Sequence, residues 1–165
     1  MKTALDAALS YLSRRAMARS ELEQRLLQKR YSSDDVDNAL CRLSEWGYLN
    51  DREYSHSYIR AKQMNYSKKR IEVELKRRGI EDRLIEETLE ETYLPNQEKE
   101  LCRRQAQKIW TEEFRRWESS YQHKKSYAKI PRDTFLRQKV GQKLLQKGYP
   151  LDLIYQVIEE IIGRE

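Results

Sequence analysis

Apolar residues recur along this chain three or four positions apart, which is the spacing of one face of an α-helix. Residues 4–12 and 36–43 show this pattern most clearly. No segment of useful length alternates apolar and polar residues, as a half-buried strand would. Five glycines and three prolines leave few sites for the tight turns of hairpins. The sequence therefore predicts an all-α fold.

Several residues predict where individual helices begin and end. Ser20 and Glu23 have the spacing of a capping box, in which each side chain accepts a hydrogen bond from the other's backbone N–H. Gly47 and Gly79 follow apolar stripes, where a residue in the left-handed conformation commonly terminates a helix. We therefore expect a helix to start at Ser20 and two helices to end at the glycines.

The helices are predicted to come in threes, because the apolar stripes repeat. A shift of 49 residues carries the stripe at 22–40 onto 71–89, and a further shift of 69 carries it onto 140–158. The middle helix ends alike in each copy: Lys29-Arg30-Tyr31, Arg78-Gly79-Ile80 and Lys147-Gly148-Tyr149. We expect three tandem three-helix repeats, stacked into an elongated, curved body. Their predicted bounds are 1–49, 50–94 and 95–165.

The third repeat is longer than the second, and its extra residues lie near 117–132. This stretch is polar and basic, breaks the helical periodicity and ends near Pro131. Before it, an apolar stripe containing Trp110 and Trp117 predicts a long first helix. We expect both tryptophans to pack in the core rather than to serve as a ligand platform.

The composition limits the size of the core and the chemistry available. Charged residues make up 36% of the 165 positions and hydrophobic residues only 38%, with a net charge of +6, so a single thick core is not expected. Cys41 and Cys102 are too few for a disulfide scaffold and lack metal-ligand spacing. No apolar run approaches the roughly 18 residues of a membrane span, and Asp6 interrupts any signal-peptide apolar region. We expect a soluble, basic, monomeric protein of a reducing compartment, without a metal site.

Charge separates by helix within each predicted repeat. The middle helices carry net charges of +2, +4 and +4, whereas the third helices carry −3, −5 and −3. Helix dipoles favour acidic first turns and basic last turns, which explains part of this separation. Helix dipoles do not explain Lys68, Lys69 and Arg70, because these cations lie at a predicted helix N-terminus, where the dipole disfavours positive charge. Two interpretations stay open: a surface for a charged partner, or a solvated face.

Catalytic signatures are missing from the sequence. The five glycines are isolated and form no P-loop, and no serine lies in a G-x-S-x-G turn. His56 and His123 are far apart and have no motif around them. We therefore expect no enzyme activity, no catalytic residue and no cofactor.

Four segments, in order along the chain, resemble one family. Gly47-Tyr48-Leu49-Asn50-Asp51, followed by residues 53–60, is similar to the central signature of RecX regulatory proteins. Residues 12–15 with 19–22 resemble that family's N-terminal block, residues 70–80 its second-repeat helix, and Lys147-Gly148-Tyr149 with Ile154 its C-terminal repeat. The chain departs from the pattern at Arg30, where glycine is expected, at residues 66–69, and in the longer basic stretch at 119–131.

The resemblance implies a cytoplasmic, non-enzymatic modulator of the RecA recombinase. Such a protein lies along the groove of the RecA–single-stranded DNA filament and inhibits its ATP hydrolysis, strand exchange and coprotease activity. Single-stranded DNA within or beside the filament is a further expected partner. The expected contact residues are basic residues of the N-terminal block, the middle helices and the insertion: Arg14, Arg15, Lys68, Lys69, Arg70, Lys76, Arg77, Lys124, Lys125, Arg132, Arg137, Lys139 and Lys143.

A DNA-binding module that acts without RecA is the competing hypothesis. Three-helix units with short turns are typical of helix-turn-helix domains, and an isoelectric point near 9.2 permits phosphate contacts. Against this hypothesis, the last helix of each predicted repeat is acidic and poorly suited to a major groove.

Overall fold

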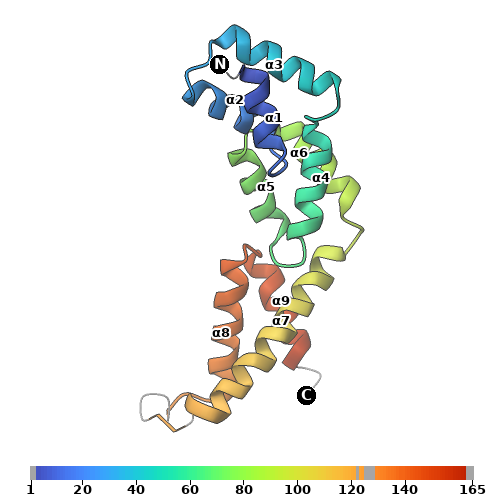
Figure 1. Ribbon diagram of the computed structural model, residues 1–165. Helices are drawn as coiled ribbons and strands as arrows, with labels where there is room; N and C mark the ends of the chain where they lie inside the picture. The colour runs from blue at the N-terminus through green and yellow to red at the C-terminus, as the bar shows by residue number, and fades with distance from the viewer. Residues whose placement is uncertain (1–2, 122, 125–128, 163–165) are drawn as a thin grey trace. The chain divides into compact units, whose positions relative to one another are not determined.

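The computed structural model describes residues 3–121, 123–124 and 129–162, which form α-helices and no strand (Figure 1). The predicted all-α fold is confirmed. None of the helices in these ranges is both long and apolar enough to cross a membrane. A short π-helical turn, η1 (Trp117–Tyr121), extends the seventh helix. The helices are α1 (Ala4–Leu12), α2 (Arg19–Gln28), α3 (Ser33–Glu45), α4 (Asp51–Lys62), α5 (Lys68–Arg77), α6 (Asp82–Thr92), α7 (Gln97–Arg116), α8 (Arg132–Gln146) and α9 (Leu151–Ile162).

The chain divides into two compact units. The first unit contains Met1–Ala61 and Glu72–Thr92, and the second contains Lys62–Ile71 and Tyr93–Glu165. The first unit therefore holds α1–α3, most of α4, the C-terminal part of α5, and α6. The second unit holds the N-terminal part of α5 together with α7–α9. Nine helices in the described ranges match the predicted succession of triplets, while the repeat bounds 1–49, 50–94 and 95–165 stay a prediction.

In the first unit, α1, α2 and α3 bury their apolar stripes against one another. Leu22, Leu26 and Leu43 are completely buried in this cluster. Two of the helices are capped by their own residues. Thr3 and Asp6 form a capping box at α1, and the Ser32 hydroxyl accepts a hydrogen bond from the backbone N–H of Asp35 at α3. Local sequence and packing thus agree in these two helices.

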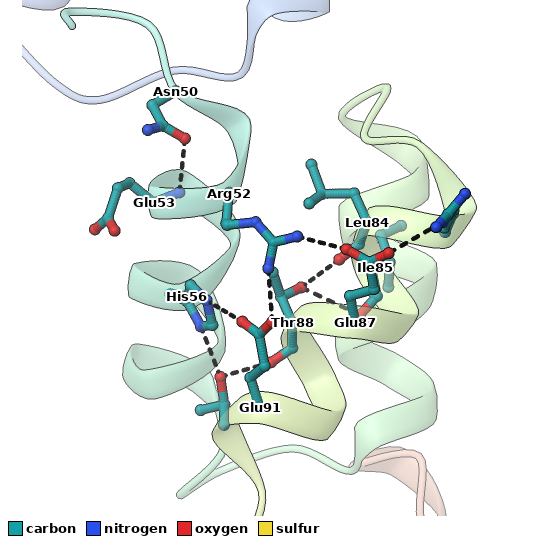
Figure 2. Close-up of polar contacts among 11 residues, drawn as sticks. Asn50, Arg52, Glu53, His56, Leu84, Ile85, Glu87, Thr88 and Glu91 are labelled. Atoms are coloured by element: carbon teal, nitrogen blue, oxygen red, sulfur yellow. Dashed lines mark hydrogen bonds and ion pairs between the residues drawn. The ribbon is translucent and has the colours of Figure 1, made fainter.

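A polar network joins α4 to α6 in the same unit (Figure 2). The Arg52 guanidinium pairs with Glu87 and with Glu91, the latter at 2.7 Å. The imidazole of His56 lies 2.9 Å from Glu91 Oε2 through Nε2 and 2.9 Å from Thr92 Oγ1 through Nδ1. His56 belongs to the segment that resembles the family signature, and Arg52 lies between its two parts; here both residues hold two helices together.

Left-handed residues end the middle helices, as the repeated punctuation predicts. Gly79 and Gly148 have φ values of +76° and +88°, and Arg30 has the same conformation at +65°. Gly47, after α3, is also left-handed at +76°. Both predicted glycine terminators are confirmed, and Arg30 takes the backbone conformation of the glycine that it replaces.

The capping box predicted at Ser20 and Glu23 is wrong. The N-cap of helix α2 is Ala18, two residues before Ser20, and it supplies no side-chain hydrogen bond to the helix, which begins at Arg19. The backbone N–H of Arg19 instead donates to Asp51 Oδ1 at 2.8 Å, from the start of α4. Tertiary structure therefore supplies the cap that the local sequence was expected to supply.

In the second unit, α7, α8 and α9 surround one apolar cluster. Trp110 and Trp117 are buried in it, which confirms their predicted core role. Through η1, the chain continues α7 into the stretch predicted to be an insertion. The rings of Trp117 and Tyr121 lie 4.9 Å and 5.0 Å, centroid to centroid, from Phe135 on α8. The start of the extra segment therefore helps to build the core.

Candidate functional site

A cavity of about 410 Å³ on the second unit gathers basic side chains from three helices. The segment before α5 and its first turn form one wall, and α7 and α8 form the others. Four cations line the cavity, together with the carboxylate of Glu112, several neutral polar side chains and the apolar Ile109. We name this cavity the basic pocket; its lining residues are Asn65, Tyr66, Arg70, Gln105, Lys108, Ile109, Glu112, Lys143, Gln146 and Lys147.

Ser67 fixes the start of α5 against the end of α8. Its backbone N–H donates to the Lys147 carbonyl at 3.0 Å, and its hydroxyl donates to the Gly148 carbonyl at 2.7 Å. The same hydroxyl accepts a hydrogen bond from the backbone N–H of Arg70 at 3.1 Å. A Cβ at Gly148 would lie 2.7 Å from both the Ser67 hydroxyl and Arg70 Cβ, so this approach requires glycine. Two distant segments are thereby joined at one edge of the pocket.

The Tyr66 ring organises the cations of the pocket. The Arg70 guanidinium carbon lies 4.1 Å from the ring centroid, and Lys62 and Lys147 place their ammonium groups 5.8 Å and 5.9 Å from it. Cations are attracted to an aromatic face within about 6 Å. Arg70 also donates to the Gln146 carbonyl at the end of α8. The ring therefore holds positive groups at the pocket edge.

Lys147 lies in a positively charged environment. Its ammonium group is 3.3 Å from the Asn65 carbonyl oxygen, and within the described ranges it pairs with no carboxylate. Burial lowers the pKa of Lys147, and the charges of Lys108, Arg70 and Lys143 lower it further, whereas Glu112 opposes them. Several positive charges thus lie close together here, and their repulsion disfavours the charged form of Lys147.

Glu113, next to the pocket residue Glu112, is buried, with only 2% of its surface exposed. Lys143 donates to its Oε1 at 2.6 Å, and Arg116 donates to the same oxygen at 3.1 Å. A buried carboxylate needs such partners because isolated burial of a charge is costly. Lys143 is therefore partly neutralised inside the chain, unlike Lys147.

Tertiary contacts surround the three cations at the N-terminus of α5, Lys68, Lys69 and Arg70, which the helix dipole alone does not explain. The Lys68 backbone N–H donates to Glu98 Oε1 at 2.9 Å, so an acidic residue of α7 meets the start of α5. The Lys68 ammonium lies 4.6 Å from the Tyr93 ring centroid. Arg70 contacts Tyr66 and Gln146, and Lys69 is exposed. A role of the three cations in partner binding stays a prediction.

The predicted contact residues of the first unit lie outside the basic pocket. Arg14 is exposed beside a separate cavity of about 90 Å³, and Arg77 is exposed on α5. Arg15 pairs with Glu21. The Lys76 ammonium lies 3.1 Å from both Glu72 and Asp82, and their hydrogen bonds, Asp82 first, raise the pKa of Lys76.

Most of the remaining predicted residues of the second unit contact aromatic or acidic side chains. Arg70 and Lys143 alone of the predicted set line the basic pocket. Arg137 pairs with Glu159, and Arg132 is 3.1 Å from Asp133. Lys125 lies outside the described residues. Three cations lie 5.2–5.5 Å from ring centroids: Lys124 from Tyr121, Arg132 from Phe114 and Lys139 from Phe135.

Tyr66, whose basic neighbours in the sequence make it a candidate contact residue, lines the pocket, whereas the predicted set lacks Lys108 and Lys147. Lys147 had one usable signal, because it belongs to the repeated helix ending that Gly148 completes. Lys108 had no such signal in the sequence, because it lines the pocket only once α7 packs against α8.

In the described ranges, no group of three or more His, Cys, Asp or Glu side chains could hold a metal ion. Burial of Cys102, with Glu98 nearby, raises the pKa of its thiol to about 12.

Comparison with known proteins places this fold among tandem three-helix regulators. The model of the first three-helix domain of RecX matches residues 4–43, and that of the second matches 50–89. "Regulatory protein RecX" of Legionella pneumophila strain Corby is 34% identical over 162 residues, covering 98% of this chain and 96% of the relative. The same-named protein of Pseudomonas syringae pv. tomato is 30% identical, with 92% and 86% covered.

A solved structure agrees with these relatives. The crystal structure of RecX from Lactobacillus salivarius matches with a TM-score of 0.70 and 28% identity, covering 95% of this chain and 93% of that one. The fold and the matches together define a regulatory protein built from tandem three-helix domains. The chain belongs to the RecX family, which confirms the resemblance noted in its sequence.

Proposed function

We propose that this protein binds the RecA–single-stranded DNA filament and inhibits its ATP hydrolysis, strand exchange and coprotease activity. Membership of the RecX family carries this proposal, because the similarity spans nearly the whole of both chains. In this role the protein acts as a monomer in the cytoplasm and has no catalytic activity of its own.

The distribution of charge supports a filament as the partner. The middle helices are basic and the third helices acidic, so the surface offers both signs of charge. A nucleoprotein filament likewise presents phosphates together with charged protein side chains. Complementary charge guides association and selects partners more than it adds affinity. Exposed Arg14 and Arg77 are positioned to take part in such contacts.

Co-sedimentation tests the proposal directly. RecA is assembled on single-stranded DNA with a slowly hydrolysed ATP analogue, and the purified chain is pelleted with the filament, with RecA alone and with DNA alone. We expect strong retention by the filament and a dose-dependent fall in RecA's ATP hydrolysis. Absence of both effects would reject the proposal. Sequence-specific protection of duplex DNA without RecA would favour the helix-turn-helix hypothesis instead.

A pair of charge-reversed variants tests which surface is used. Arg14→Glu with Arg77→Glu changes two predicted contact residues, and Arg42→Glu with Arg60→Glu changes two exposed arginines outside the predicted set. The net charge changes equally in both. We expect the first variant to lose filament binding and the second to keep it. Equal loss in both would show a nonspecific effect of net charge and reject the predicted surface.

A further inference from the structure

We propose that the basic pocket binds the phosphate backbone of a single-stranded nucleic acid directly. This inference goes beyond the proposed function, because it assigns a ligand that the chain takes by itself, without RecA. Within the pocket, Arg70, Lys108 and Lys147 are the phosphate-binding residues, and Tyr66 positions Arg70 and Lys147.

The balance of charge in the pocket favours an anionic ligand. Four cations line the pocket against the single carboxylate of Glu112. Buried Glu113 partly neutralises Lys143, whose Nζ lies 2.6 Å from Glu113 Oε1. Lys147 has no carboxylate partner in the described ranges and lies among other cations. An anion placed between these groups would relieve their mutual repulsion, which the single carboxylate of Glu112 does not balance.

The geometry of the donors fits a phosphate. Arg70 approaches from α5, Lys108 from α7 and Lys147 from the end of α8, so positive donors surround the cavity on three sides. Phosphate oxygens accept hydrogen bonds from several directions, and arginine and lysine are their usual partners. The side chains of Gln105 and Asn65 add neutral amide groups beside the cations.

Two features favour a nucleic-acid strand over a free phosphate or an acidic peptide. Sites for single strands combine a positively charged groove with aromatic side chains, and Tyr66 beside Arg70 provides that combination. Lys62, whose ammonium group lies 5.8 Å from the Tyr66 ring centroid, adds a further cation beside the pocket lining, as a ligand with repeated phosphates requires. The predicted ligand is therefore a chain of phosphodiesters.

A double variant and a matched control test this site. Lys108→Gln with Lys147→Gln removes two pocket cations, and Arg42→Gln with Arg60→Gln removes two exposed cations of the first unit. Binding of a fluorescent oligo-dT strand to the chain alone is measured by anisotropy at several salt concentrations. We expect the pocket variant to bind about tenfold more weakly and its salt slope to fall by roughly 1.4, or 0.7 for each lost phosphate contact. The control should keep the affinity and slope of the unaltered protein.

Further measurements separate the alternatives. Lys108→Arg with Lys147→Arg should restore binding, and thermal unfolding should show that all variants fold. Equal affinity of the pocket variant and the control would overturn the proposal. So would an acidic peptide such as polyglutamate displacing the strand at the same charge concentration, or inorganic phosphate binding without any strand binding. Because RecA is absent, failure here leaves retention by the filament as a separate test of the proposed function.

Discussion

Three equivalent helix endings show how the backbone constrains single residues. Gly79 and Gly148 occupy left-handed positions where a Cβ would also collide with neighbouring atoms, at 2.4 Å from Ser20 Oγ and at 2.7 Å from Ser67 Oγ. Arg30 occupies the same conformation at φ +65°. Left-handed backbone disfavours residues with a Cβ. Arg30 therefore carries a strain that glycine would remove.

We predict that Arg30→Gly raises the free energy of unfolding by about 0.5–1 kcal/mol, because glycine adopts this conformation without strain. Gly79→Ala makes the opposite change at an equivalent position. It should lower the free energy of unfolding by about 1–3 kcal/mol, since backbone strain and the close contact with Ser20 add together. Denaturant unfolding followed by circular dichroism measures both. Destabilisation by Arg30→Gly would show that its side chain contributes more than the conformation costs.

At the scale of helices, two kinds of N-terminal cap occur. Helices α1 and α3 are capped by the residue that precedes each of them, Thr3 and Ser32. Helix α2 receives an acidic side chain from elsewhere, Asp51 at Arg19, and α5 combines its own cap, Ser67, with Glu98 of α7 at Lys68. A carboxylate at a helix N-terminus satisfies a free N–H and complements the helix dipole. Such caps also fix how two helices pack.

We predict that Asp51→Ala destabilises the protein by about 1 kcal/mol, as loss of an N-terminal cap usually does. Ser20→Ala is the control, because the expected capping box at Ser20 does not form and the change should be nearly neutral. Thermal unfolding of the two variants gives the comparison. A larger effect at Ser20 than at Asp51 would contradict the assignment of the cap.

At the scale of the whole molecule, the cations divide by what they contact. Many are occupied within the chain: Arg15 and Lys76 with carboxylates, Lys68 and Lys139 with aromatic rings. Those of the basic pocket outnumber its acids. High net positive charge alone therefore does not define a binding surface. The local balance between cations and carboxylates does.

We predict that the purified protein neither binds nor hydrolyses ATP, since its isolated glycines form no phosphate-cradling loop. In the proposed function, the RecA filament carries the nucleotide. Calorimetric titration with ATP and magnesium, in the absence of RecA, should give no saturable heat. Saturable binding at one molecule per chain would contradict this prediction and would call for a search for a different phosphate site.

The helices and their ends were predictable because their signals are local. Apolar spacing predicted the all-α fold, glycines after apolar stripes predicted the left-handed positions at Gly47 and Gly79, and an apolar stripe predicted Trp110 in the core. The capping box at Ser20 failed for an instructive reason. Its spacing was suitable, but the competing contact from Asp51 comes from another helix and leaves no trace near Ser20.

The sequence by itself determined the helical class and the succession of helices in threes, and its motifs pointed to the RecX family, because periodicity, turn residues and motifs act over short distances along the chain. Only the tertiary structure decided which cations are neutralised and which gather. Arg70, Lys108 and Lys147 meet because Ser67 bonds to the end of α8 and α7 packs against α8. Charge interactions depend on distance in space, so residues tens of positions apart form one site without any shared pattern in the sequence.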